Sequence, residues 1–266
     1  LATTGLLAVW GAARWQWIVL LWAAPPVAGA VLFCRVPLAR KNGGAPPLPL
    51  RALARKGVFY ALLAAIVLGG AAEVTMAQWA SAFLEKGLRL PKLAGDVWGV
   101  CFFSLMLALG RSGYAALGAR VPLHRLLIGG SGAAAVLYVV CALAQSPLLG
   151  VLACGLTGLC VSLLWPGAII LASRRIPSAG AAMFALLSAG GDVGASLGAF
   201  CVGRAADWAQ ASGTVFAGAA GESGALRAGL LLAAVFPLLC CGVHTALHCT
   251  EARGGLPAGS ERRRRQ

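Results

Sequence analysis

Long apolar blocks alternate with short polar segments along the whole chain. A helix that crosses about 30 Å of hydrocarbon needs roughly 20 predominantly apolar residues. Seven blocks have this character, at 15–33, 57–83, 97–117, 126–144, 148–173, 177–203 and 228–247. A further apolar block, 1–10, is too short to span and leads directly into the tight link at 11–14, so we interpret it as the end of another helix. The pattern predicts an all-α, polytopic membrane helix bundle.

Composition supports a membrane protein and argues against other classes. The chain is 59% hydrophobic and only 11% charged, which is far more apolar than a soluble domain needs to fill one core. Its net charge of +14 would suit a nucleic-acid partner, but the basic residues form short clusters between apolar blocks. We therefore expect no nucleic acid. No phosphate loop, zinc motif or nucleophile motif is present, so we expect no enzyme and no cofactor.

The basic clusters also predict an orientation. Lys and Arg are concentrated in every second inter-block segment, including the Pro- and Gly-rich stretch 36–56 and the tail 250–266. Because cytoplasmic loops of membrane proteins carry the excess of Lys and Arg, we place these segments inside the cell. The sequence predicts a multi-pass protein of the plasma (inner) membrane with a cytoplasmic C-terminus, whose basic tail attracts anionic membrane lipid.

The block 177–203 contains one charged residue, Asp192. On a helix Ser188, Asp192 and Ser196 fall on one face. The opposite side carries a stripe of small residues that allows close helix packing, namely Gly190, Gly194 and Gly198. An Asp at the membrane centre costs about 2.5–3.5 kcal/mol, whereas each Leu, Ile, Phe or Val returns only about 0.3–0.6 kcal/mol. Asp192 therefore needs a partner, water or a proton, either as a coupling residue or as a carboxylate that locks two helices together.

Glu73 is the second acid inside an apolar block. It lies 16 residues after the start of its block and Asp192 lies 15 residues after the start of 177–203, so we expect the two acids at equal depth, sharing a proton or a solute. The alternative is that Glu73 makes an interhelical hydrogen bond to a backbone loosened at Gly69 and Gly70. Nearby, Gln78, Trp79 and Trp165 offer polar and aromatic contacts for an amphipathic solute, although Trp79 also suits an anchor at the membrane surface.

Two further features bear on the site. Pro166 should kink its helix and free backbone carbonyls, which are tolerated in a membrane only where they line a cavity or are buried in protein. His244 and His248 have the i, i+4 spacing that a metal uses, but no second ligand pair accompanies them, and we predict no metal site.

The stretches "LALGRSGYAALGAR" and "GLTGLCVSLLWPGAIILASRR" resemble the loop between helices eight and nine and the tenth helix of major facilitator superfamily transporters. Within that superfamily, "AEVTMAQWASAFLEKGL" and "SAGGDVGASLGAF" are most similar to the fucose-permease-like, sugar-type branch. The resemblance assigns a cytoplasmic gate to Gly110, Arg111, Gly118 and Arg120. It also divides the chain into the end of an N-terminal lobe (1–35), a linker (36–56), a six-helix C-terminal lobe (57–249) and a tail (250–266).

The resemblance implies a secondary active transporter that moves a small solute by alternating access, coupled to protons, with a missing N-terminal lobe of the same protein as partner. The alternative, from another class, is a truncated membrane protein that transports nothing. A coding sequence that continues in frame upstream of Leu1 favours the transporter.

Overall fold

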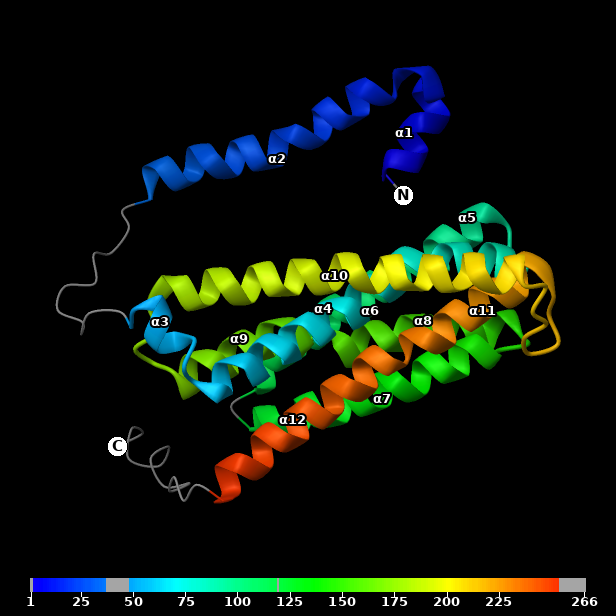
Figure 1. Cartoon of the computed structure of the whole chain (residues 1–266). Coiled ribbons are helices and arrows are strands. Elements are labelled where there is room, and N and C mark those ends of the chain that lie inside the picture. Colours follow the sequence, from blue (N-terminus) through cyan, green and yellow to red (C-terminus); the bar gives the residue numbers. More distant parts are fainter. Residues whose placement is uncertain (1, 37–47, 119, 254–266) are drawn as a thin grey trace. The chain divides into compact units, whose positions relative to one another are not determined.

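The computed structural model describes residues 2–36, 48–118 and 120–253, and within them every regular element is a helix (Figure 1). Within these described residues, seven helical segments are long and apolar enough to cross a membrane. This confirms the predicted all-α chain with seven candidate spans, as expected of a polytopic membrane helix bundle. The rest of the linker and the tail, 37–47 and 254–266, lies outside the described residues. The chain divides into two compact units, Leu1–Pro46 and Pro47–Gln266.

The first unit contains α1 (Ala2–Trp10), the short turn η1 (Ala12–Arg14) and α2 (Trp15–Arg35). Gly11 has a φ of +80°, a conformation that glycine adopts without strain, and this allows the chain to reverse between the helices. The indole nitrogen of Trp22 donates to the Thr3 hydroxyl at 3.1 Å and ties α1 to α2. Among the described residues of this unit, only α2 is long enough to span, as predicted.

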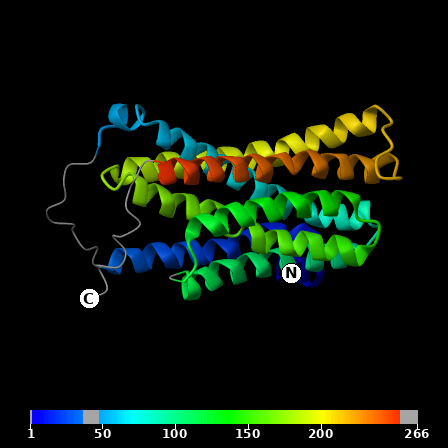
Figure 2. The same ribbon diagram turned by 90° about the horizontal axis from the view of Figure 1, so that it is seen from below.

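The second unit holds the remaining spans, which run side by side in both views (Figures 1 and 2). Its elements are α3 (Leu50–Leu53), α4 (Gly57–Ala82), η2 (Phe83–Gly87), α5 (Lys92–Gly95), η3 (Asp96–Cys101), α6 (Phe102–Leu117), α7 (Leu123–Leu143), α8 (Pro147–Val161), α9 (Leu164–Arg175), α10 (Gly180–Ala211), α11 (Gly221–Ala233) and α12 (Val235–Arg253). The short turns η2 and η3 are π-helical.

Two predicted spans are each divided into two helices. The block 148–173 forms α8 and α9 with a break at Ser162 and Leu163, and the last span forms α11 and α12 with a break at Ala234. Each break comes three or four residues before a proline, Pro166 and Pro237, because proline cannot donate a hydrogen bond to the preceding turn.

Helix α10 continues to Ala211, past the predicted end at Gly203. Arg204 and Asp207, which end the apolar block, form an exposed pair on the same helix at 3.8 Å. Polar residues mark where hydrocarbon ends, not where a helix ends. The helix stops where Gly213 takes a φ of +66° just beyond it, as glycine does after a helix C-terminus.

The glycines of α10 pack against α4, as their spacing predicts. A side chain at Gly194 would meet the Val67 backbone, and one at Gly198 would lie 2.9 Å from the Ala71 Cα. Gly190 faces Leu63 in the same way. The contacts advance together along both helices, so α4 and α10 run parallel and touch backbone to backbone over several turns. Helix α4 is also covered by α9 and α12 and forms the centre of the unit.

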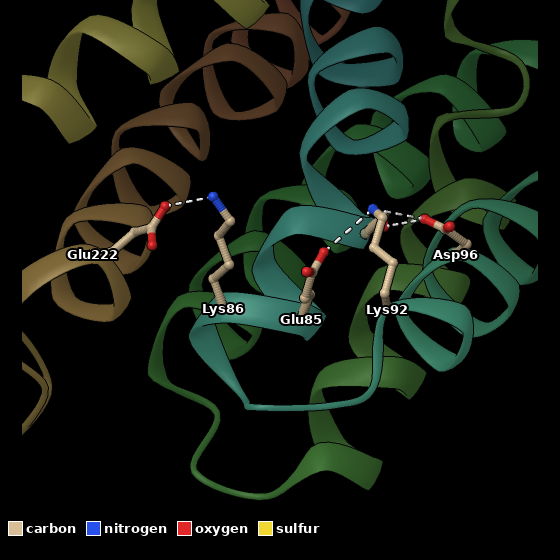
Figure 3. A network of polar contacts seen from close by, with 6 residues as sticks. Glu85, Lys86, Lys92, Asp96 and Glu222 are labelled. Atoms are coloured by element: carbon tan, nitrogen blue, oxygen red, sulfur yellow. Dashed lines mark hydrogen bonds and ion pairs between the residues drawn. The ribbon is translucent and has the colours of Figure 1, made fainter. Parts of the chain in front are cut away.

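Polar contacts fasten one end of the unit (Figure 3). Lys86 of η2 pairs with Glu222 of α11 at 2.6 Å, and Lys92 lies between Glu85 at 3.2 Å and Asp96 at 3.1 Å. Arg227 of α11, which binds the backbone next to Lys86, is in contrast only 3% exposed. Because its guanidinium donates to carbonyls at the ends of two other elements, it links three segments of the chain.

The carbonyls that Arg227 binds are those of Ala142 and Ala144, at 3.1 and 2.6 Å, and Gly87, at 3.3 Å. The first two belong to the C-terminal end of α7, where helix carbonyls have no partner within the helix and where a cation is favoured. Its guanidinium also lies 5.7 Å from the centre of the Phe83 ring.

Candidate functional site

The strongest polar feature inside the spans is an ion pair between Glu73 and Arg111. Arg111 Nη2 donates to Glu73 Oε1 at 2.6 Å. Glu73 lies near the middle of the 31-residue span formed by α4 and η2, and its side chain is only 12% exposed. The other carboxylate oxygen, Oε2, is buried and accepts no hydrogen bond from the residues that the structure describes. The pair neutralises two charges and leaves one acceptor free.

Arg111 has a second partner that follows from Pro166. Proline has no N–H, so the carbonyl four residues before it, that of Ser162, loses its usual helical partner. Arg111 Nε donates to this carbonyl at 3.1 Å. One guanidinium therefore holds the carboxylate of α4 and the free carbonyl at the break between α8 and α9. This satisfies a polar backbone group that would otherwise be buried without a partner.

A cavity of about 430 Å³ opens beside the pair, within the range of small-molecule sites. It is lined by one acid, one base, aromatic rings and aliphatic side chains from α4, α6 and α9, namely Glu73, Arg111, Tyr114, Leu163, Trp165, Pro166, Ile169 and Ile170. The arrangement offers a charged, hydrogen-bonding end and an apolar wall, which suits an amphipathic solute.

Trp165 reaches the cavity because glycines make room for its ring. A Cβ atom at Gly191 would lie 2.6 Å from the ring, and one at Gly70 would lie 3.3 Å from it. The indole thus occupies a space between α4 and α10 that any larger residue would close. The structure thus places Trp165, one of the aromatic residues that the sequence offered for a solute, in the lining of the cavity.

Asp192 does not join this site, contrary to the expectation of two acids at equal depth. It lies between Gly190, which faces Leu63, and Gly194, which faces Val67, so Glu73 is about 12 Å further along α4. The sequence analysis counted residues from the start of each apolar block and assumed that the two blocks start at the same depth. This was wrong, because α10 begins further toward the predicted cytoplasmic end of the bundle than α4 does.

The polar face of α10 is turned away from α4. Asp192 and Ser196 are exposed and Ser188 is half-buried. The Ser196 hydroxyl donates to the backbone carbonyl of Asp192 at 2.9 Å, within its own helix. No residue that the structure describes pairs with the Asp192 carboxylate, so this face remains available to a partner or to water.

Gln78 and Trp79 also lie outside the cavity. Gln78 is exposed, whereas the Trp79 indole donates to the Ala199 carbonyl at 3.1 Å and lies 3.2 Å from the position of a Cβ at Gly203. Trp79 thus packs α4 against α10, six residues beyond Glu73 and on another face of the helix, as the helical geometry predicts.

The residues assigned to a cytoplasmic gate separate into two groups. Gly110 and Arg111 lie inside α6, whereas Gly118 and Arg120 belong to the end of α6 and the link to α7. A side chain at Gly110 would meet Ser162, so this glycine allows α6 to approach the α8–α9 break and Arg111 to reach Glu73. Arg111 therefore lies within a helix and pairs with Glu73, although its side chain is still 44% exposed, and it is not part of the loop. The sequence indicated a position within a helix, because Arg111 lies inside the apolar block 97–117. The resemblance of this stretch to a cytoplasmic loop led to the other assignment.

The two histidines of the last helix point to different neighbours. His244 is buried, with Nδ1 3.4 Å from the Cys240 sulfur. The ring of His248 instead stacks on His124 of α7, with 3.9 Å between centroids. The i, i+4 spacing of these histidines thus serves helix packing.

In comparisons with known proteins, no family model, no curated protein and no solved structure matches this chain. The functional argument therefore rests on the site itself.

Proposed function

We propose that the chain is the greater part of a secondary active transporter of the major facilitator type, which moves a small amphipathic solute across the membrane and couples this movement to protons. The observation that carries the proposal is the Glu73–Arg111 pair beside a 430 Å³ cavity within a bundle of candidate spans. Ionisable groups inside a membrane are costly and are characteristic of solute and proton pathways.

The geometry supports a role for Glu73 in coupling. Protonation of Glu73 removes the charge that holds Arg111 to α4, while Arg111 keeps its bond to the Ser162 carbonyl. The proton therefore loosens α6 and the α8–α9 break from α4 without freeing Arg111 entirely. A group whose proton occupancy differs between two conformations couples the proton gradient to their interconversion.

The solute is expected to meet three kinds of contact. Its hydrogen-bond donors bind the free Oε2 of Glu73, its apolar part lies on Trp165, and Ile169 and Ile170 cover it from α9. The exposed polar face of α10, with Asp192, is where a second lobe of the same protein closes the pathway.

The test is transport in proteoliposomes, using the protein together with any coding sequence that continues in frame upstream of Leu1. Uptake of a panel of labelled sugars, organic acids and amines is measured with and without an imposed pH gradient. We expect Glu73→Gln to abolish accumulation driven by the gradient while solute exchange at equal pH continues. Asp192→Asn tests the second acid in the same assay.

Glu222→Gln is the matched control, because it makes the same chemical change in an exposed pair at the end of the bundle. Undiminished coupling in both Glu73→Gln and Asp192→Asn would contradict the proposed proton role. Uptake no greater than that of empty liposomes across the panel would favour the alternative, a membrane protein that transports nothing.

A further inference from the structure

A second hollow of the unit, about 420 Å³, adjoins the Glu73 cavity, with which it shares Tyr114 and Leu163, and extends away from it along α6 and α7. Helix α8 packs against both α6 and α7, whereas α6 and α7 make few contacts with each other within the described residues (Figure 2). The space between α6 and α7 is therefore a groove, with Leu159, Cys160 and Leu163 from the end of α8 and the start of α9 as its floor. We name it the α6–α7 groove.

Glycines shape this groove. Gly113 of α6 and Gly129 of α7 line it, and a Cβ atom at either would meet nothing within 4 Å. By contrast, a Cβ at Gly130, on the same helix, would clash with the Cys160 carbonyl. Gly130 thus brings α7 onto α8, while Gly113 and Gly129 leave open space beside that contact.

The walls of the groove are apolar and its end is basic. Leu109, Leu117 and Leu159 line it and are between 42% and 53% exposed. Arg125, in the first turn of α7, also lines it, and its side chain makes no hydrogen bond or ion pair with any residue that the structure describes. The N-terminus of α7 adds partial positive charge at the same place.

We propose that the α6–α7 groove binds an anionic phospholipid, with one acyl chain along the glycine-lined walls and the phosphate at Arg125. An apolar groove that ends in an unpaired cation near a membrane surface complements this kind of molecule, which carries an apolar chain and a negative headgroup. The groove lies at the end of the bundle that the charge distribution predicts to be cytoplasmic, so the lipid belongs to the inner leaflet. This proposal does not depend on transport.

Selectivity arises mainly at Arg125. Acyl chains are equally apolar in the groove and in the bilayer, so the walls select shape and the cation selects charge. One basic residue near a membrane surface corresponds to roughly a fivefold preference for an anionic over a zwitterionic headgroup.

The test uses the full chain purified in a neutral detergent. Bound lipid is counted by native mass spectrometry, and the shift of the unfolding midpoint is recorded with three probes: dioleoyl phosphatidylglycerol, dioleoyl phosphatidylcholine and glycerol 3-phosphate. We expect phosphatidylglycerol to bind about fivefold more tightly than phosphatidylcholine, and glycerol 3-phosphate to cause no shift. A shift with glycerol 3-phosphate equal to that with phosphatidylglycerol would show a site for free phosphate and overturn the proposal.

Variants separate the two parts of the site. Arg125→Gln should make the two phospholipids bind equally, and Arg125→Lys should restore the preference. Gly129→Leu should fill the groove and weaken both lipids, whereas Gly242→Leu, at a position on α12 that also faces open space, should bind as the unmodified protein does.

Folding is checked by the unfolding midpoint without lipid, and Gly113→Leu replaces Gly129→Leu if the latter does not fold. Retention of the phosphatidylglycerol preference in Arg125→Gln, or of full lipid binding in the folded groove-filling variant, would refute the site.

Discussion

The contact between α4 and α10 predicts that one added methyl group at Gly194 destabilises the unit. A Cβ at this position would lie 2.7 Å from the Val67 carbonyl carbon and 2.8 Å from the Val67 Cα, whereas ordinary contacts begin at 3.4 Å. The obstacle is backbone and cannot rotate away. The Val67 carbonyl oxygen would be closer still, so the two helices must separate locally by on the order of 1 Å, which weakens the neighbouring contacts at Gly190 and Gly198.

The magnitude follows from two opposing terms. Overpacking of a tight interior costs about 1–3 kcal/mol, while replacing a helical glycine with alanine gains about 0.5–1 kcal/mol. Because the obstacle at Gly194 is backbone, the cost lies in the upper part of its range, about 2–3 kcal/mol. The net free energy of unfolding should then fall by about 1–2.5 kcal/mol, which lowers the midpoint by on the order of 2–10 °C for a domain of this size. Only the second term applies to Gly242→Ala, because a Cβ at Gly242 meets nothing within 4 Å. This control should raise the midpoint.

Thermal unfolding in detergent, followed by tryptophan fluorescence, measures both variants under the same conditions. If Gly194→Ala unfolds at or above the temperature of the unmodified protein while Gly242→Ala is stabilised, α10 does not pack on α4 through its glycines. The parallel arrangement of these two helices would then be wrong.

Two further predictions concern the end of the bundle shown in Figure 3. Arg227→Gln should lower the free energy of unfolding by about 3 kcal/mol, since the buried guanidinium loses charge-assisted hydrogen bonds to three carbonyls. Chemical denaturation in detergent measures this change. A loss below about 1 kcal/mol, the value of an exposed pair, would argue that these buried hydrogen bonds do not stabilise the unit. Lys86→Gln should lower the free energy of unfolding far less than Arg227→Gln does, because both members of the Lys86–Glu222 pair are about half exposed and solvent screens their attraction. The difference from the unmodified protein should vanish in 1 M salt, where the screening length is about 3 Å. A salt-independent loss in Lys86→Gln would contradict this.

The spans were predictable from sequence because each needs only an apolar block of sufficient length. The glycine stripe of α10 was predictable for a similar reason, since the spacing of Gly194 and Gly198 is a property of one helix alone. The site was not predictable in the same way. Which acid is paired depends on the register between α4, α6 and α10, and register is set by contacts between blocks that are distant in the sequence.

Arg111 shows the difference most clearly. The apolar block around it indicated a span, whereas its charge and the resemblance of the stretch to a loop indicated a cytoplasmic position. Glu73 and the Ser162 carbonyl stabilise the cation within the bundle, and the sequence does not show that these groups meet. Pro166 gave a partial signal, because it identifies Ser162 as the carbonyl that needs a donor.

The junction of α8 and α9 also has a mechanical consequence. A continuous helix moves as one rigid body, so a displacement at one membrane surface is carried to the other. Two short helices such as α8 and α9 carry a displacement across only if the junction between them is rigid. The contact that stiffens the junction of α8 and α9 is made by Arg111 of α6, which binds the Ser162 carbonyl. The stiffness of this junction therefore depends on α6. A substitution at Arg111 should consequently let α8 and α9 move independently of each other, although the sequence of neither helix has changed.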